Sequence, residues 1–195
     1  MRLADRDFVT PPWDHPLDVE RALALIPETA TISGMFYLAL VAGAKRRQVA
    51  LPGADRRYLP FQFYSLRDFA QLLTQACPLF YPGMPLRDGL RRSGRAGPAA
   101  LLSSTLGKVT LGAATGAYDV VSAFAKTYSI NVKPSRCDVE RHDQQSLVLR
   151  LEVPYFLDSH HVGAFEGALE HAGVKGEVLI ARRTDTSADL QLKWR

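Results

Sequence analysis

The chain has 195 residues, of which 47% are hydrophobic and 23% are charged, and its formal net charge is +4. These values are typical of one globular domain with its own hydrophobic core. Because no apolar run is long enough to span a membrane and the N-terminal segment has no apolar signal core, we expect a cytoplasmic protein.

Helices are predicted over the first two thirds of the chain, from the spacing of apolar residues and from the residues that start and stop helices. Ser65 is an N-cap candidate with Asp68 three residues later, and Pro78 is expected to end that helix. Gly94 is expected to end the next one. The predicted helices are residues 14–27, 34–47, 65–78, 84–94, 97–113 and 117–129, with a loop over residues 48–64.

The last third changes to the two-residue period of half-buried strands. Leu147, Leu149 and Leu151 alternate with Arg150 and Glu152. The predicted strands are residues 129–133, 147–153, 177–183 and 190–195, with a helix over residues 158–172 between the strand pairs. Short polar turns imply antiparallel pairing. We therefore expect a single α+β domain over residues 1–195, with N-terminal helices packed beside a four-stranded antiparallel sheet and residues 1–13 as an N-terminal extension.

Residues 153–173 hold three of the five histidines of the chain. His160 and His161 are adjacent, so on a helix their side chains point about 100° apart. His160 and His171 are three turns apart, roughly 16 Å along the axis. Helical zinc ligands are instead spaced three or four residues apart. We expect no metal site on this helix and interpret the histidines as structural or solvated.

One face of the same helix carries small residues where a surface helix normally carries charges. Gly163, Ala164 and Gly167 lie on it, between His160 and His171. Glycines weaken a helix but allow another backbone or a flat ligand to approach closely. One interpretation is close helix packing inside the domain or across a dimer. The other is a shallow ligand or partner groove with His160 and His171 at its ends.

Basic residues cluster at residues 45–47, 56–57 and 86–95. We interpret them mainly as a solvated face, with an anion-binding patch as the alternative, and nucleic-acid binding is not expected because no such motif accompanies them. Arg91 and Arg95 share a face only if the helix continues past Gly94, and they would then form a clamp for an anion. Cys77 and Cys137 are isolated from each other, so we expect reduced thiols.

Residues 20–40, 64–95 and 154–173 carry a family resemblance. On these segments the chain from Leu17 to Trp194 resembles an uncharacterised protein family expanded as paralogues in myxobacteria. More distantly, the order of elements resembles the haem-nitric-oxide-binding domains, the vinyl-reductase-like domains and the vesicle-tethering TRAPP subunits. The resemblance implies helices beside a four-stranded antiparallel sheet, with an internal pocket.

The cofactor chemistry of these relatives does not carry over to this sequence. The haem helix of the first group needs a proximal histidine, and no histidine occurs between His15 and His142. The Tyr-x-Ser-x-Arg motif that follows a strand in that group is also missing, so bound haem is not expected. The resemblance to the tethering subunits implies that Cys77 would be the counterpart of the cysteine that holds an acyl chain there, but a buried inert thiol is the favoured interpretation.

No nucleotide-binding, hydrolase or metalloprotease motif occurs, so we expect no enzymatic activity. The resemblance and the small-residue face favour a small-molecule-binding sensory or regulatory module with an internal apolar pocket. Its apolar or planar ligand would lie between the helix that carries Phe69, Leu73 and Cys77, the helix over residues 99–111 and the sheet. The alternative is a dimeric adaptor that binds partner proteins through an exposed apolar patch.

Overall fold

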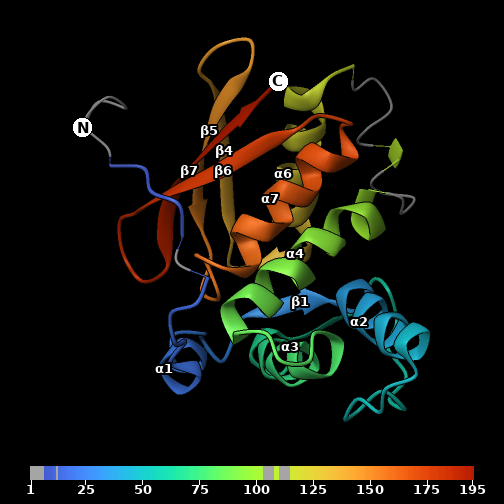
Figure 1. The fold of residues 1–195 in the computed structure, drawn as a ribbon. Coiled ribbons are helices and arrows are strands. Elements are labelled where there is room, and N and C mark those ends of the chain that lie inside the picture. Colours follow the sequence, from blue (N-terminus) through green and yellow to red (C-terminus); the bar gives the residue numbers. More distant parts are fainter. Residues whose placement is uncertain (1–6, 12, 103–107, 110–114) are drawn as a thin grey trace.

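The computed structural model describes residues 7–11, 13–102, 108–109 and 115–195, and places helices beside two antiparallel sheets (Figure 1). The helices are α1 (Val19–Ala24), α2 (Gly34–Arg47), α3 (Leu66–Phe80), α4 (Leu86–Leu102), α6 (Ala117–Asn131) and α7 (His160–His171). The strands are β1 (Thr31–Ser33), β2 (Phe63–Ser65), β3 (Val132–Lys133), β4 (Arg136–Arg141), β5 (Ser146–Glu152), β6 (Gly176–Arg182) and β7 (Ser187–Trp194). The predicted α+β class, with helices packed beside a four-stranded antiparallel sheet, is confirmed.

The four-stranded sheet has the order β4-β5-β7-β6, and its register follows the predicted alternation. Leu147 pairs with Leu192 and Leu149 pairs with Leu190, and all four side chains are buried. Arg150, which lies between Leu149 and Leu151 in the sequence, is exposed on the other face. This face of alternate leucines is apolar because successive side chains of a strand point to opposite sides.

Helices α6 and α7 cover the apolar face of that sheet, and α4 crosses between α7 and the N-terminal helices α1 to α3 (Figure 1). Val162, Phe165 and Leu169 of α7 are all buried, as predicted for the face laid on the sheet. The Phe165 ring meets that of Phe124 of α6 edge to face, with 5.2 Å between centroids. The core is therefore continuous from the sheet through α6 and α7.

Several predicted helix ends were wrong. The helix predicted over residues 14–27 is limited to α1, Val19–Ala24, and its N-cap is Asp18. Helix α3 continues through Pro78 to Phe80, and α4 continues through Gly94 and Pro98 to Leu102. A proline near the C-terminal end of a helix removes one hydrogen bond, which tertiary packing offsets in both helices. The N-cap of α3 is confirmed, since the Ser65 Oγ accepts a hydrogen bond from the Asp68 amide at 3.1 Å. The rest of the helix predicted over residues 97–113 lies outside the described residues, apart from residues 108 and 109.

The strand predicted over residues 129–133 does not belong to the four-stranded sheet. Residues 129–131 end α6, and β3 joins a small second sheet with the order β2-β1-β3. The missing strand is β4, whose alternation of charged residues with Cys137 and Val139 gives a weak apolar signal. The small sheet was missed because strands of two or three residues carry no measurable period.

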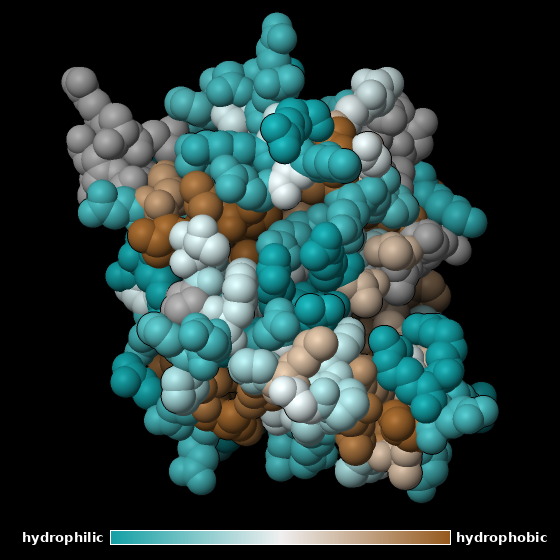
Figure 2. Space-filling model, in the orientation of Figure 1, coloured by the Kyte–Doolittle hydropathy of each residue, from teal (hydrophilic) through white to brown (hydrophobic). Residues whose placement is uncertain are grey.

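The segment predicted as an N-terminal extension is partly tied to the sheet. The backbone of Val9 pairs with Ile180 of the edge strand β6, with N–O distances of 3.0 and 2.9 Å. In the view of Figure 2 most of the surface is hydrophilic, and hydrophobic residues show in separate patches. Within the described part of the chain, no helix is both long enough and apolar enough to cross a membrane.

Candidate ligand pocket

The small-residue face of α7 lies against α4 of the same chain. A Cβ added to Gly163 would overlap the backbone of Arg91, and one added to Gly167 would overlap the backbone of Arg95. On the other helix, a Cβ on Gly94 would overlap the carbonyl of His160. The two backbones therefore touch at these glycines. The interpretation as close helix packing inside the domain therefore holds for Gly163 and Gly167, and the alternative of an open groove at these two glycines is corrected, because α4 occupies that face.

The two arginines predicted to clamp an anion form salt bridges with carboxylate side chains of the same chain. Arg91 and Arg95 share one face, because α4 continues past Gly94, but each pairs with a carboxylate of α7. The Arg91 guanidinium binds both oxygens of Glu166, at 2.9 Å through Nε and 2.8 Å through Nη2. Arg95 pairs with Glu170, and this hydrogen bond lowers the pKa of that carboxyl. These pairs stabilise the α4–α7 crossing.

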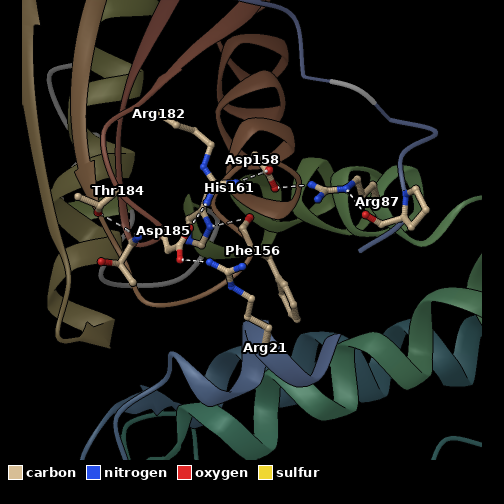
Figure 3. Close-up of polar contacts among 10 residues, drawn as sticks. Arg21, Arg87, Phe156, Asp158, His161, Arg182, Thr184 and Asp185 are labelled. Carbon is tan, nitrogen blue, oxygen red and sulfur yellow. Dashed lines mark hydrogen bonds and ion pairs between the residues drawn. The ribbon is translucent and has the colours of Figure 1, made fainter. Parts of the chain in front are cut away.

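An ion-pair network holds the segment just before α7 (Figure 3). Asp158 lies between Arg87 of α4, at 2.7 Å, and Arg182 of β6, at 3.0 Å. Arg182 also contacts Asp185 at 3.3 Å, and Asp185 binds Arg21 of α1 at 2.7 Å. The side chains of Arg87 and Asp158 are each only 14% exposed, so this ion pair is the one in the network that solvent screens least. The network fixes where α7 begins relative to α1, α4 and the sheet.

His161 is fixed in a buried chain of hydrogen bonds. Its Nδ1 donates to the carbonyl oxygen of Phe156 at 3.3 Å, and its Nε2 accepts from the hydroxyl of Tyr128 at 2.7 Å. The Tyr128 hydroxyl is also 2.8 Å from the hydroxyl of Tyr155. Burial, and to a smaller extent the neighbouring His160, lowers the pKa of His161 to about 3. The imidazole is therefore neutral and has one defined tautomer.

A pocket of about 270 Å³ lies between helices α2, α3, α4, α6 and α7. Its walls are mostly apolar. The apolar side chains that carry the argument are Phe36 and Leu40 of α2, Phe69 and Leu73 of α3, Phe124 of α6 and Ala164 of α7. The five helices come from distant parts of the chain, so the pocket exists only in the folded protein.

The polar groups on these walls differ between the two ends of the pocket. On the side of α6 and α7 they include the imidazole of His160 and the hydroxyl of Tyr128. At the C-terminal end of α2 they are the guanidinium groups of Arg46 and Arg47. Burial lowers the pKa of His160 to about 4, with a hydrogen bond to the backbone of Leu90 acting in the opposite direction. His160 is thus neutral near pH 7, and the positive charge of the pocket lies at the arginines.

The structure brings together only part of the predicted site. Four predicted residues line the pocket: Phe69, Leu73, His160 and Ala164. His171 is exposed at the other end of α7 and does not line it. Cys77 is buried between α3 and α4, where burial raises the pKa of its thiol to about 11. The predicted wall over residues 99–111 falls largely outside the described residues, and no residue of the sheet lines the pocket.

The pocket residues of α2 and α6 were missed in the sequence. Helix α2 is apolar nearly all round, so its pattern does not indicate which side faces a cavity. The one available signal was the run Lys45-Arg46-Arg47, which we interpreted as a solvated face. Among the described residues, no group of three or more His, Cys, Asp or Glu side chains could hold a metal ion.

Over residues 25–195 the sequence matches a family model described as "Protein of unknown function (DUF2378)". The chain belongs to this family. A comparison of this DUF2378 member with curated proteins finds no match. Its resemblance to vinyl-reductase-like domains and TRAPP subunits, and the myxobacterial expansion, stay predictions.

Among solved structures, the DUF2378 chain is similar in fold to H-NOX proteins. The H-NOX protein from K. algicida in the unliganded Fe(II) state superposes with a TM-score of 0.61 at 11% identity, covering 84% of this chain and 97% of that one. The S. oneidensis protein in the Fe(II)NO state has a TM-score of 0.61 at 13% identity, covering 84% and 99%. An H-NOX structure that concerns heme distortion has a TM-score of 0.59 at 10% identity, covering 84% and 92%. At these identities the likeness establishes a shared fold alone.

Proposed function

We propose that this protein is a non-enzymatic sensory or regulatory module that binds a small, largely apolar molecule in the pocket between its helices. The observation that carries the proposal is the pocket itself, about 270 Å³ in volume and lined mainly by apolar side chains. Ligand sites are typically concave, mostly apolar and equipped with a few placed polar groups. The H-NOX-like fold supports a sensory role by analogy of fold.

The position of the pocket also supports a regulatory role. Tyr128 lies on its wall and belongs to the buried hydrogen-bond chain through His161 and Tyr155. A ligand that moves Tyr128 would therefore disturb the start of α7, where Asp158 connects the sheet to the helical part. Contacts that differ between the free and bound states are what a ligand needs to shift a conformational equilibrium.

The size of the pocket argues against haem as the ligand. The pocket, at about 270 Å³, lies at the small end of ligand pockets, which measure about 300–1,000 Å³, and haem is larger than most of the ligands that such pockets hold. Haem iron is held by His, Cys, Met or Tyr side chains, and on this wall they are His160, Tyr81 and Tyr128, of which Tyr128 is already hydrogen-bonded to two partners. The neutral imidazole of His160 is therefore the side chain that a test with haemin has to remove. We propose that the described residues do not fit haem. A haemin titration that gives a saturable one-to-one complex, lost in His160→Leu, would contradict this.

The alternative function is a dimeric adaptor with an exposed apolar patch, either at Gly163 and Gly167 or over residues 34–40. Helix α4 covers the first of these surfaces. The second belongs to α2, where Phe36 and Leu40 line the pocket. No helix of the described residues fills the pocket, and so we place the function there.

The test uses Nile red, a neutral apolar dye whose fluorescence rises and shifts to the blue in apolar surroundings. Ala42 of α2 lines the pocket and is half-buried, so Ala42→Phe fills the cavity without crowding the core. Ala99 of α4 is exposed and does not line the pocket, so Ala99→Phe adds the same apolar surface elsewhere. Both variants are checked by far-UV circular dichroism.

We expect one saturable Nile red site in the wild type and in Ala99→Phe. In Ala42→Phe the affinity should fall about tenfold, which corresponds to roughly 1.4 kcal/mol of lost apolar contact. Equal binding by the two variants would place the dye outside the pocket. A folded wild type without saturable binding would refute the proposed function.

A further inference from the structure

Two cations at the rim of the pocket have no anionic partner in the part of the chain that the structure describes. Arg46 and Arg47 form the last turn of α2, both are exposed, and both line the pocket. Neither takes part in a salt bridge among the described residues, in contrast to Arg87, Arg91 and Arg95. The helix dipole favours cations at a helix C-terminus. It does not account for the placement of these two at a cavity.

Contacts on one side hold the Arg47 guanidinium at the pocket edge. Its carbon lies 4.8 Å from the centroid of the Phe80 ring and 5.6 Å from that of Tyr81. Its Nη1 donates to the carbonyl oxygen of Gly43 at 3.3 Å. Gly43, Phe80 and Tyr81 all line the pocket. Stacking on aromatic rings orients a guanidinium and leaves its other N–H groups for an anion.

The remaining walls carry no compensating charge. Among the residues that the structure describes, no Asp or Glu lines the pocket. The apolar side chains of Phe69, Leu73 and Phe124 lie deeper, together with the neutral imidazole of His160. The pocket is therefore positive at its rim and uncharged within. A neutral ligand would leave the rim cations unpaired, and a ligand charged at both ends would place one charge in apolar surroundings at a high cost.

We propose that the pocket binds a single-chain amphiphile with one anionic head, of the medium-chain fatty carboxylate class, with the head at Arg46 and Arg47 and the chain directed inward between α2, α3 and α6. This inference rests on the proposed function, since it specifies the ligand class of the same pocket. The guanidinium groups match a carboxylate in charge and in hydrogen-bond geometry.

The experiment compares decanoate with decanol, which have the same chain length and differ in the head group. Each competes with Nile red for the pocket at low ionic strength and again in high salt. The variants are Arg46→Gln and Arg47→Gln, and the control is Lys45→Gln. Lys45 is an exposed cation of the same helical turn that does not line the pocket.

We expect decanoate to displace the dye at about tenfold lower concentration than decanol, the effect of one charge-assisted hydrogen bond at an exposed site. This preference should shrink in high salt. It should be lost in Arg46→Gln, in Arg47→Gln or in both, where the preference is the ratio of the decanol and decanoate concentrations measured within each variant. Lys45→Gln should retain the full preference.

Failure of this inference can be told apart from failure of the proposed function. If decanol and decanoate displace the dye equally well, the pocket binds apolar molecules and only the anionic head is refuted. If Lys45→Gln lowers the decanoate preference as much as the two arginine variants do, the charge effect is not local and the inference is also refuted. If the dye has no saturable site at all, the proposed function itself fails.

Discussion

Acidification from pH 8 to pH 5 is expected to destabilise this protein through its two buried histidines. Burial lowers the pKa of His160 to about 4 and that of His161 to about 3, whereas an unfolded chain has the ordinary value of about 6.5. Neither imidazolium finds a carboxylate partner among the described residues. The folded state therefore stays neutral at both sites while the unfolded state takes up protons.

The sign and the size of the effect follow from linkage. Above pH 6.5 both states are neutral at these sites and the histidines have no effect on stability. As the pH falls below about 6.5, the unfolded chain binds up to two more protons than the folded one, so its free energy falls. Each histidine then lowers the free energy of unfolding by about 2 kcal/mol at pH 5. The sum, about 4 kcal/mol, is a large part of the 5–15 kcal/mol typical of a domain.

Urea unfolding at pH 8, 6 and 5, followed by tryptophan fluorescence and far-UV circular dichroism, measures this dependence. His160→Gln should retain about half of the pH-dependent loss, because one titrating site remains. His171→Gln is the matched control, since His171 is exposed at the far end of the same helix and should leave the loss unchanged. A wild-type free energy of unfolding that falls by less than about 1 kcal/mol between pH 8 and pH 5 would refute the reasoning.

Four further outcomes are expected. Gly163→Ala should lower the free energy of unfolding by up to about 3 kcal/mol because its Cβ overlaps backbone; Gly97→Ala, which meets no atom within 4 Å, should be neutral or stabilising in the same urea assay. Asp158→Asn should cost about 1–3 kcal/mol, since it weakens two ion pairs, and a cost no larger than that of a surface substitution would contradict the role of the network. Tyr128→Phe should cost about 1–3 kcal/mol by leaving two buried partners unsatisfied, and an unchanged urea midpoint would argue against the hydrogen-bond chain. Cys77 should react with a disulfide reagent at pH 8 only as fast as the protein opens, because its pKa is about 11 and it is buried; rapid labelling under native conditions would show an accessible thiolate.

Local patterns in the sequence were sufficient to predict most of the helices and strands. The alternation at Leu147, Leu149 and Leu151 predicted which face of the sheet is buried, because side chains alternate along a strand whatever the rest of the chain does. Ser65 and the span of residues 34–47 predicted their helices for a similarly local reason. The spacing of the histidines predicted that His160 and His171 lie far apart, and they do lie at opposite ends of α7.

The pairings between distant segments were decided only by the tertiary structure. The glycine face of α7 predicted a close neighbour, but only the folded chain identifies that neighbour as α4, since Gly94 looks like a helix stop in the sequence and is instead a crossing point. The partners of Arg91 and Arg95 follow from the same crossing. The pocket is the clearest case, because its walls come from five helices and no single helix pattern records which side faces a shared cavity. Periodicity is a property of one element, whereas a partner or a cavity is a property of how several elements pack, and that depends on contacts between residues far apart in the chain.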